Sequence, residues 1–359
     1  MKRLFCSILV IALLGLSTPL TAQLRGAGSG LYSFLSLPVS SRLSALGGDN
    51  VAIQDGELSM AMMNPALLCA NTDKVLQLNY AYLMPGTMFG SVLYGHNFGR
   101  ASFEKGFDQA TDKPNYFAIG LHYLDYGRMP YADETGTLTG GTFTAKDIVI
   151  QAMYARQLGE QFTVGVTLKP VYSIYEQYTA FALGADVGAH FHTHDSTLHV
   201  GLTLRNVGWQ FSGFYNEVGG QHRESLPLNL EAGLSYRLKH APIRLGLTIH
   251  NLQRWNLGYQ QTNMTTDAVD IKWHDMLFRH TIFSLDIVPK SDKFYLTLSY
   301  NHRRRAEMNL ADQRSLAGFA VGAGVRIYKL RVGFAVSQLT KSNLTYQASL
   351  SLDINSMLK

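Results

Sequence analysis

The chain has 359 residues, of which only 16% are charged, whereas Gly (33), Tyr (19) and Phe (18) are numerous. Soluble domains carry roughly 25% charged residues, so the composition argues against an ordinary soluble protein. The formal net charge of +5 selects no class of partner and gives no reason to expect nucleic acid.

The first residues have the pattern of an export signal. Lys2 and Arg3 precede an apolar run from Leu4 to Leu16, and Leu20-Thr21-Ala22 supplies small residues for cleavage. The run is shorter than the ~20 residues of a membrane helix. We therefore expect a signal peptide over residues 1–22. Its removal leaves Cys69 alone, so we expect no internal disulfide in the mature chain.

Residues 23–74 form a second segment, with little charge and no regular alternation. Gly47-Gly48 permits backbone conformations that other residues avoid. Glu57–Met63 could form a short helix, and Asn64 followed by Pro65 is typical of a helix start, with Asn as the N-cap and Pro at the first helical position.

From residue 75 onwards, apolar and polar residues alternate with a period of two, as in Phe294, Leu296, Leu298 and Tyr300. This is the pattern of strands with one apolar face. We predict about fourteen strands near residues 75–83, 87–97, 116–124, 147–157, 161–174, 180–192, 196–206, 227–238, 243–251, 281–288, 293–301, 315–327, 330–338 and 343–354.

The connections between these strands alternate in length. Short ones lie at 158–160, 193–195, 239–242, 289–292 and 328–329, and long ones at 125–146, 207–226, 252–280 and 302–314. An even number of strands, short turns at one end and long loops at the other are typical of an outer-membrane barrel. Phe98–Asn115 is long where a short turn is expected. A soluble β-sandwich also alternates, but usually carries shorter strands and a more charged outer face. The sequence thus predicts an all-β protein, a transmembrane antiparallel β-barrel spanning residues 75–359.

A barrel of about fourteen strands is wide enough to need filling. We therefore interpret residues 23–74 as an N-terminal hatch, or plug, folded into the lumen. Arg42 would then seek a carboxylate such as Glu231 or Asp286. The alternative is a periplasmic loop.

Three groups of residues are candidate binding sites. Trp209, Phe211, Tyr215 and Trp255 lie near predicted outer strand ends, where an aromatic girdle explains them and a partner contact is the alternative. A predicted outer loop contains Arg303, Arg304 and Arg305. They are either solvated loop charges or a binding site for a partner or for the acidic groups of lipopolysaccharide. His190 and His192 share a strand face and could share a metal, but His194 completes no ligand set.

No catalytic motif accompanies these groups. Gly-x-Ser-x-Gly, a Walker loop and His-Glu-x-x-His are absent from the sequence. We therefore expect no enzymatic activity and no cofactor. A hydrolase would need a nucleophile and a base within hydrogen-bond reach at the barrel rim.

A set of ordered motifs resembles the PorV/PorQ group of outer-membrane proteins, which share the barrel of FadL-type transporters. The signature is Ser41-Arg-Leu-Ser-Ala-Leu-Gly-Gly48 followed by Asn64-Pro-Ala-Leu-Leu68. The stretches that favour PorQ-like members are Tyr32–Pro38, Leu121–Gly127, Asp133–Gly136 with Gly141–Phe143, and Leu168–Glu176. The resemblance extends over most of the mature chain.

The resemblance implies a function in the type IX secretion system. PorQ-like proteins sit in an attachment complex with a PorV-like shuttle, a PorU-like sortase and PorZ, for which PorQ is the membrane anchor, and the sortase joins cargo to anionic lipopolysaccharide. The expectation is thus a non-catalytic scaffold in the outer membrane. The alternative is a FadL-like channel for hydrophobic small molecules. Because the predicted inward positions are mostly Thr, Ser, Gly, Asn and Glu, they favour a polar, plugged lumen over an apolar channel.

Overall fold

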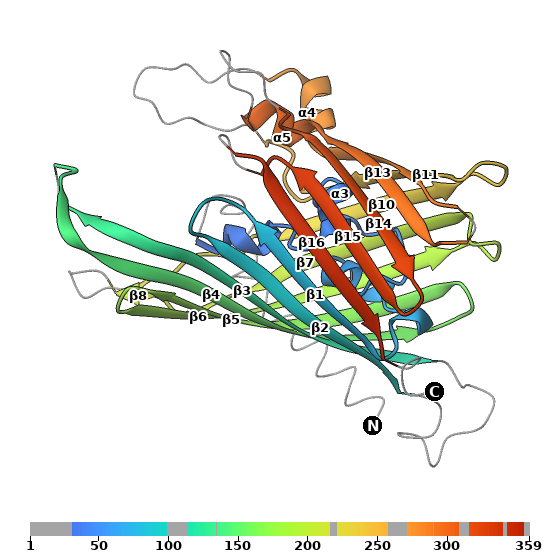
Figure 1. Ribbon diagram of the computed structural model, residues 1–359, viewed down its shortest axis with the longest axis horizontal. Coiled ribbons are helices and arrows are strands. Elements are labelled where there is room, and N and C mark those ends of the chain that lie inside the picture. Colours follow the sequence, from blue (N-terminus) through green and yellow to red (C-terminus); the bar gives the residue numbers. More distant parts are fainter. Residues whose placement is uncertain are drawn as a thin grey trace.

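Fourteen antiparallel strands close into one barrel in the computed structural model (Figure 1). The structure describes residues 31–98, 114–133, 135–215, 221–257, 271–289, 291–308, 316–339 and 343–354. The predicted signal peptide and most of the Phe98–Asn115 connection lie outside these residues. No helix in the described part is both long enough and apolar enough to cross a membrane.

The barrel strands are numbered in chain order, and β8 (Phe214–Tyr215) and β9 (Gln221–His222) form a separate two-stranded sheet. The fourteen are β1 (Val75–Tyr82), β2 (Met88–Phe98), β3 (Asn115–Ala132), β4 (Leu138–Gln157), β5 (Phe162–Tyr175), β6 (Tyr178–His192), β7 (Leu198–Ser212), β10 (Asn229–Arg237), β11 (Ile243–Ile249), β12 (Thr281–Ile287), β13 (Phe294–Asn301), β14 (Phe319–Ile327), β15 (Leu330–Ser337) and β16 (Thr345–Asp353). Strands β1 and β16 close the barrel, with Val75 opposite Asp353.

Alternation along each strand places apolar side chains on the outer surface. On β13, Leu296 and Leu298 are 46% and 50% exposed, whereas Thr297 between them is fully buried. A lipid bilayer requires an apolar outer surface and a sheet without free edges. The closed barrel meets the second requirement because every barrel strand pairs on both sides. The prediction of a fourteen-stranded outer-membrane barrel is confirmed, and the protein is an outer-membrane protein.

Several predicted outer loops contain regular structure instead. Strands β3 and β4 continue through much of 125–146 as a hairpin that projects beyond the other strands (Figure 1), with register shifts between Asp125 and Arg128 and between Pro130 and Ala132. Strand β7 extends to Ser212, and helices α4 (Trp273–Arg279) and α5 (His302–Met308) occupy parts of 252–280 and 302–314. The alternation signal weakens where both strand faces leave the membrane, so the sequence pattern ended these strands too early.

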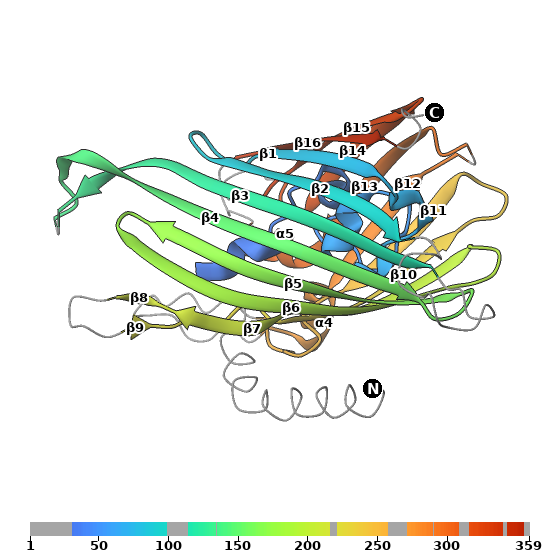
Figure 2. The same ribbon diagram turned by 90° about the horizontal axis from the view of Figure 1, so that it is seen from below.

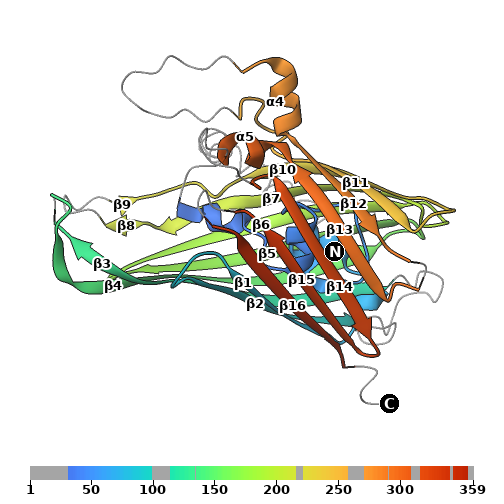
Figure 3. The same ribbon diagram turned by 45° about the horizontal axis from the view of Figure 1, so that its top comes forward.

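Residues 31–74 lie inside the barrel, as Figures 2 and 3 show for the elements before β1. They form the 3₁₀ helices η1 (Leu31–Ser36), η2 (Leu58–Met62), η3 (Pro65–Leu67) and η4 (Ala70–Thr72) and the short helix α3 (Ser41–Ala45). Helix α3 packs on β13–β16, and η3 packs on β4–β6. The predicted helix at Glu57–Met63 is the 3₁₀ helix η2. We call residues 31–74 the inner segment.

Candidate functional site

Arg42 of helix α3 is the centre of an ion network that joins the inner segment to the barrel wall. Its side chain is fully buried. Two nitrogens bond both carboxylate oxygens of Asp286 on β12, at 3.0 and 2.9 Å, and Nε lies 2.9 Å from Asp55. The guanidinium also stands 4.4 Å from the ring centre of Tyr295. Of the two carboxylates proposed for Arg42, the structure thus pairs it with Asp286.

Glu231, the other carboxylate proposed for Arg42, belongs to a second network. Arg205 of β7 lies 3.0 Å from Glu231 of β10 and 3.2 Å from Asp49 of the inner segment. Arg205 also donates to the carbonyl of Leu35, at 3.3 Å. A buried charge is tolerated only when it is paired and hydrogen-bonded, so these pairs give the inner segment one defined position in the lumen.

The glycines of the signature sequence have backbone conformations that other residues rarely adopt. Gly47 and Gly48 have φ angles of +93° and +108°. A Cβ on Gly47 would lie 2.5 Å from Cγ2 of Ile282, and one on Gly48 would lie 2.7 Å from Nη2 of Arg304. Both positions favour glycine for the backbone conformation, and Gly47 also for its close approach to Ile282 on the wall, whereas at Gly48 the neighbour is the flexible end of the Arg304 side chain.

Asn64 and Pro65 form the start of η3, and the Asn64 side chain also bonds the barrel wall. The side-chain oxygen of Asn64 accepts from the backbone N–H of Ala66 at 3.0 Å, and Pro65 is the first helical residue. The side-chain nitrogen donates to the carbonyls of Val51 and of Ala189 on β6, at 2.8 and 3.2 Å. Asn64 is thus a helix cap and a link to the wall at once.

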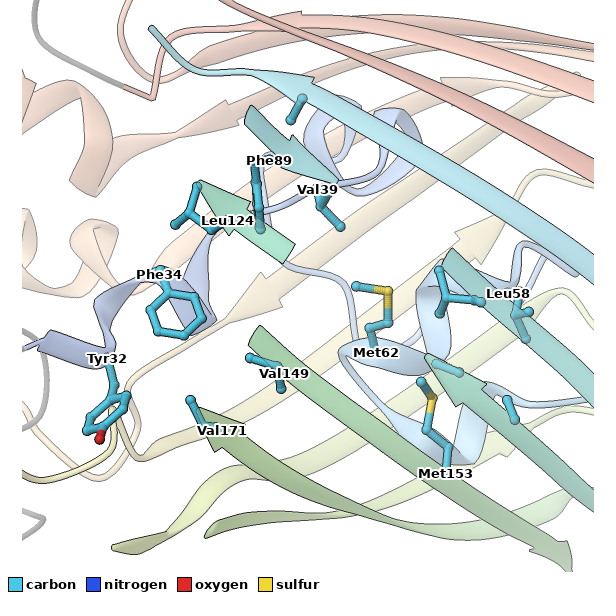
Figure 4. Packing of buried hydrophobic residues seen from close by; sticks show 14 of the residues in the cluster. Tyr32, Phe34, Val39, Leu58, Met62, Phe89, Leu124, Val149, Met153 and Val171 are labelled. Atoms are coloured by element: carbon cyan, nitrogen blue, oxygen red, sulfur yellow. The ribbon is translucent and has the colours of Figure 1, made fainter. Parts of the chain in front are cut away.

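One part of the lumen is apolar. Tyr32 and Phe34 of η1 and Met62 of η2 belong to a buried cluster with inward side chains of the wall (Figure 4). The wall residues labelled there are Phe89, Leu124, Val149, Met153 and Val171. The expectation of a mostly polar lumen therefore holds for β5, whose inward positions other than Val171 are Thr163, Gly165, Thr167, Lys169 and Ser173. On β2–β4 the apolar inward side chains alternate with Ser91, His122, Asp147 and Gln151, so the cluster is not visible as an apolar run in the sequence.

The arginine triplet is not a loop cluster. It lies in helix α5, where Arg303 pairs with Glu307 at 2.7 Å. Arg304 reaches the inner segment at Gly48, and Arg305 approaches Gly318 on the other side of the connection. The three side chains thus have different neighbours, and their role as partner contacts stays a prediction.

The predicted aromatic contacts divide between two places. Trp209 and Phe211 lie together on the outer face of β7, with ring centres 5.6 Å apart and exposures of 39% and 48%. Tyr215 lies in β8, and its side chain is outside the described part. Trp255 is 57% exposed and stacks on His280 at 5.3 Å. The role of these residues as partner contacts stays a prediction.

Sequence reasoning missed helix α4 as a candidate surface. Trp273, Leu277 and Phe278 are 70%, 43% and 47% exposed. The signal available in the sequence was the apolar pair Trp273 and Leu277 at the i, i+4 spacing of a helix face.

Asp275 fastens helix α4 to helix α5. Its carboxylate lies 2.7 Å from Nε2 of His302 and 2.8 Å from Nε of Arg279. Burial raises the pKa of Asp275, but hydrogen bonds from His302 and Arg279 outweigh it and hold the pKa below its ordinary value.

Comparison with solved structures identifies the barrel type. The toluene transporter TodX of Pseudomonas putida aligns with a TM-score of 0.53 and 12% identity, over 88% of this chain and 98% of that one. A TodX mutant described as a monoaromatic hydrocarbon channel aligns with a TM-score of 0.52 and 12% identity, over 88% and 97%. A FadL homologue of Pseudomonas aeruginosa aligns at 0.41 and 10% identity, over 91% and 99%, and we draw no conclusion from it. No family model matches the chain, and no curated protein matches its sequence.

The fold is therefore that of the TodX barrel. At this level of identity the likeness extends to the fold alone.

Proposed function

We propose that the barrel takes up small apolar compounds and passes them across the outer membrane. The observation that carries the proposal is the buried apolar cluster on the inner face of β2–β5, where Phe89, Val149 and Val171 are each at most 1% exposed. The lumen of a membrane barrel is ordinarily polar. An apolar inner wall is unfavourable in contact with water and favourable in contact with an apolar ligand.

The inner segment supplies the other side of the proposed binding site. Tyr32 and Phe34 of η1 cover the apolar wall, together with Leu58 and Met62 of η2. An apolar ligand can replace these side chains against the wall with little loss of apolar contact. We propose that movement of η1 admits the ligand, while the ion pairs of Arg42 keep the rest of the inner segment in place. The likeness in fold to a toluene transporter supports this ligand class.

Fluorobenzene binding followed by ¹⁹F NMR tests the proposal on the purified barrel in detergent. The variant Val149→Thr with Val171→Thr places two hydroxyls in the apolar wall without changing its shape. Each hydroxyl replaces a methyl group that the ligand would contact, worth about 0.8 kcal/mol of apolar contact, so we expect saturable binding that weakens about tenfold. The control is Val321→Thr, which makes the same substitution on the lipid face, where Val321 is 48% exposed. Absence of saturable binding, or equal weakening by the control, contradicts the proposal.

A second candidate is the scaffold of a surface attachment complex, which one observation favours. The exposed aromatic residues Trp273 and Phe278 of α4 lie at the end of the barrel with the long connections, and Trp255 precedes them. Aromatic residues of this kind are enriched at partner contacts. We propose that, if this function holds, α4 contacts a PorZ-like surface protein, within a complex that includes a PorU-like sortase and a PorV-like shuttle near lipopolysaccharide.

Affinity purification from gently solubilised outer membranes separates the two functions. Recovery of a PorZ-like protein with the tagged barrel, and its loss in Trp273→Ala with Phe278→Ala, would support the scaffold. Recovery of the barrel without a partner, from membranes that contain the complex, would exclude it and leave the channel.

A further inference from the structure

Asp147 on β4 is a buried carboxylate without a basic partner. Its side chain is fully buried, and the next inward position on the strand is Val149 of the apolar cluster. Three hydroxyls donate to the carboxylate. Ser173 on β5 bonds one oxygen, and Tyr126 and Tyr175 bond the other at 2.8 and 2.9 Å. Among the residues that the structure describes, no Lys, Arg or His lies within ion-pair distance of Asp147.

The other buried carboxylates in the described part of the chain each pair with a basic side chain. These pairs are Glu57 with Arg331, Asp186 with Lys169, Glu231 with Arg205 and Asp286 with Arg42. A buried carboxylate whose charge is uncompensated is costly. The hydroxyl donors stabilise the ionised form of Asp147 by hydrogen bonding, but none of them supplies positive charge. A bound cation would supply the missing charge and favour the ionised carboxylate further.

The two tyrosines that bond Asp147 belong to a group of aromatic rings. Tyr126 and Tyr175 have ring centres 6.0 Å apart, and Phe214 of β8 meets Tyr175 edge to face at 5.3 Å. The face of an aromatic ring attracts a cation, and aromatic cages bind ammonium ligands. No group of three His, Cys, Asp or Glu side chains in the described residues could hold a metal ion, either here or at His190 and His192. One carboxylate among aromatic rings suits an organic ammonium ion instead.

Tyr32 of η1 lies within electrostatic reach of Asp147 from the side of the inner segment. Its side chain is fully buried, and its hydroxyl has no hydrogen-bond partner in the described residues. Burial raises the pKa of this hydroxyl, and the charges of Asp147 and Glu224 raise it further. The surroundings of Tyr32 are thus negative, which favours a cation. A buried hydroxyl without a partner is itself costly unless something binds it.

We propose that Asp147 and Tyr32 bind the ammonium group of an organic cation whose body is apolar. The ammonium group donates to the carboxylate and to the hydroxyl oxygen, and the apolar body lies on Val149 and Val171 of the same cluster (Figure 4). The inference rests on the proposed uptake of apolar compounds and narrows the ligand class to aromatic and alkyl amines. Movement of η1, as proposed above, opens the space between Tyr32 and the buried Asp147.

Binding of 4-fluorobenzylammonium, followed by ¹⁹F NMR on the purified barrel in nonionic detergent, tests the site. 4-Fluorobenzyl alcohol has nearly the same shape without the charge, and fluorobenzene lacks the polar group. We expect the ammonium ion to bind about tenfold more tightly than the alcohol, because hydrogen bonds between charged groups are stronger than neutral ones. Equal affinity of the ammonium ion and the alcohol overturns the cation site. If fluorobenzene then binds, the proposed uptake stands and only the cation site fails.

The variant Asp147→Asn removes the charge and keeps the shape of the side chain. Its preference for the ammonium ion over the alcohol should disappear, whereas fluorobenzene should bind as in the wild type. The control is Asp125→Asn on the neighbouring strand β3, where Asp125 is partly exposed and lies 3.7 Å from Lys146. The control should keep the preference. Equal loss in the control, or a preference retained in Asp147→Asn, contradicts the assignment.

The comparison of ligands in the wild type does not depend on how the variants fold, and it separates the two proposals. Binding of the ammonium ion without binding of fluorobenzene would support the cation site and contradict the uptake of purely apolar compounds. Absence of binding by all three compounds would contradict both.

Discussion

Arg42 and Asp286, 244 residues apart in the sequence, form a two-bonded ion pair inside the barrel, at 3.0 and 2.9 Å. Arg244 on the neighbouring strand β11 bonds the same carboxylate at 2.8 Å. The inner segment is thus fastened to β12 by planar, bidentate geometry, which arginine provides and lysine does not.

Replacing Arg42 by Met should destabilise the folded barrel strongly. Loss of one partner of a buried pair leaves charge uncompensated and costs about 3–5 kcal/mol, although Arg244 would retain part of the neutralisation of Asp286. Thermal unfolding in detergent, followed by the heat-dependent shift in electrophoretic mobility, measures the change. Lys239→Met is the control, because Lys239 pairs with Asp195 at 3.0 Å but is 60% exposed. Equal stability of the two variants would contradict an anchoring role for Arg42.

Replacing Gly48 by Ala should be more costly than the same change at Gly86. Both glycines have positive φ, at +108° and +83°, so both variants incur the conformational cost, of order 1 kcal/mol. A Cβ at Gly86 meets nothing within 4 Å, whereas one at Gly48 meets Arg304. The difference in unfolding temperature between the two variants therefore isolates the contact with α5. A difference of zero would mean that Arg304 moves aside freely.

Two substitutions of Asn64 should separate its cap from its bonds to the wall. Asn64→Ser keeps a side-chain oxygen that can cap η3 but removes the donor to Val51 and Ala189. Asn64→Ala removes both and should cost about 1 kcal/mol more, the typical value of an N-cap. Chemical denaturation of the two variants checks the order. Equal stability of the two variants would contradict the capping role of the side-chain oxygen.

Helix α4 should loosen from α5 in acid. The pKa of Asp275 is lowered in the folded protein, so its bonds to His302 and Arg279 contribute stability above the ordinary aspartate pKa of about 3.9. This contribution is lost as the pH falls through the lowered folded-state value. Hydrogen exchange of Trp273–Arg279, corrected for intrinsic rates, should therefore rise relative to the strands between pH 6 and pH 3. In Asp275→Asn, exchange should already be raised at pH 6 and change less with pH.

The sequence by itself determined the barrel. Alternation such as Leu296, Thr297 and Leu298 is a local property that lipid on one side imposes on each strand, and short and long connections ordered the fourteen strands. The helix start at Asn64-Pro65 and the glycine pair Gly47-Gly48 in the inner segment were also predictable from the local sequence, because both depend on the backbone conformations that these residues prefer.

Tertiary structure alone decided which distant side chains meet. The sequence left two carboxylates open for Arg42, and only the packing of α3 on β13–β16 brings Arg42 to Asp286 and leaves Glu231 to Arg205. The same holds for Asp147, whose hydroxyl partners come from β3 and β5, and for the apolar wall of β2–β5, whose members are far apart in the chain. Periodicity reports the environment of one strand, whereas a site inside a barrel is composed of inward positions from many strands, and their register and closure are properties of the whole sheet.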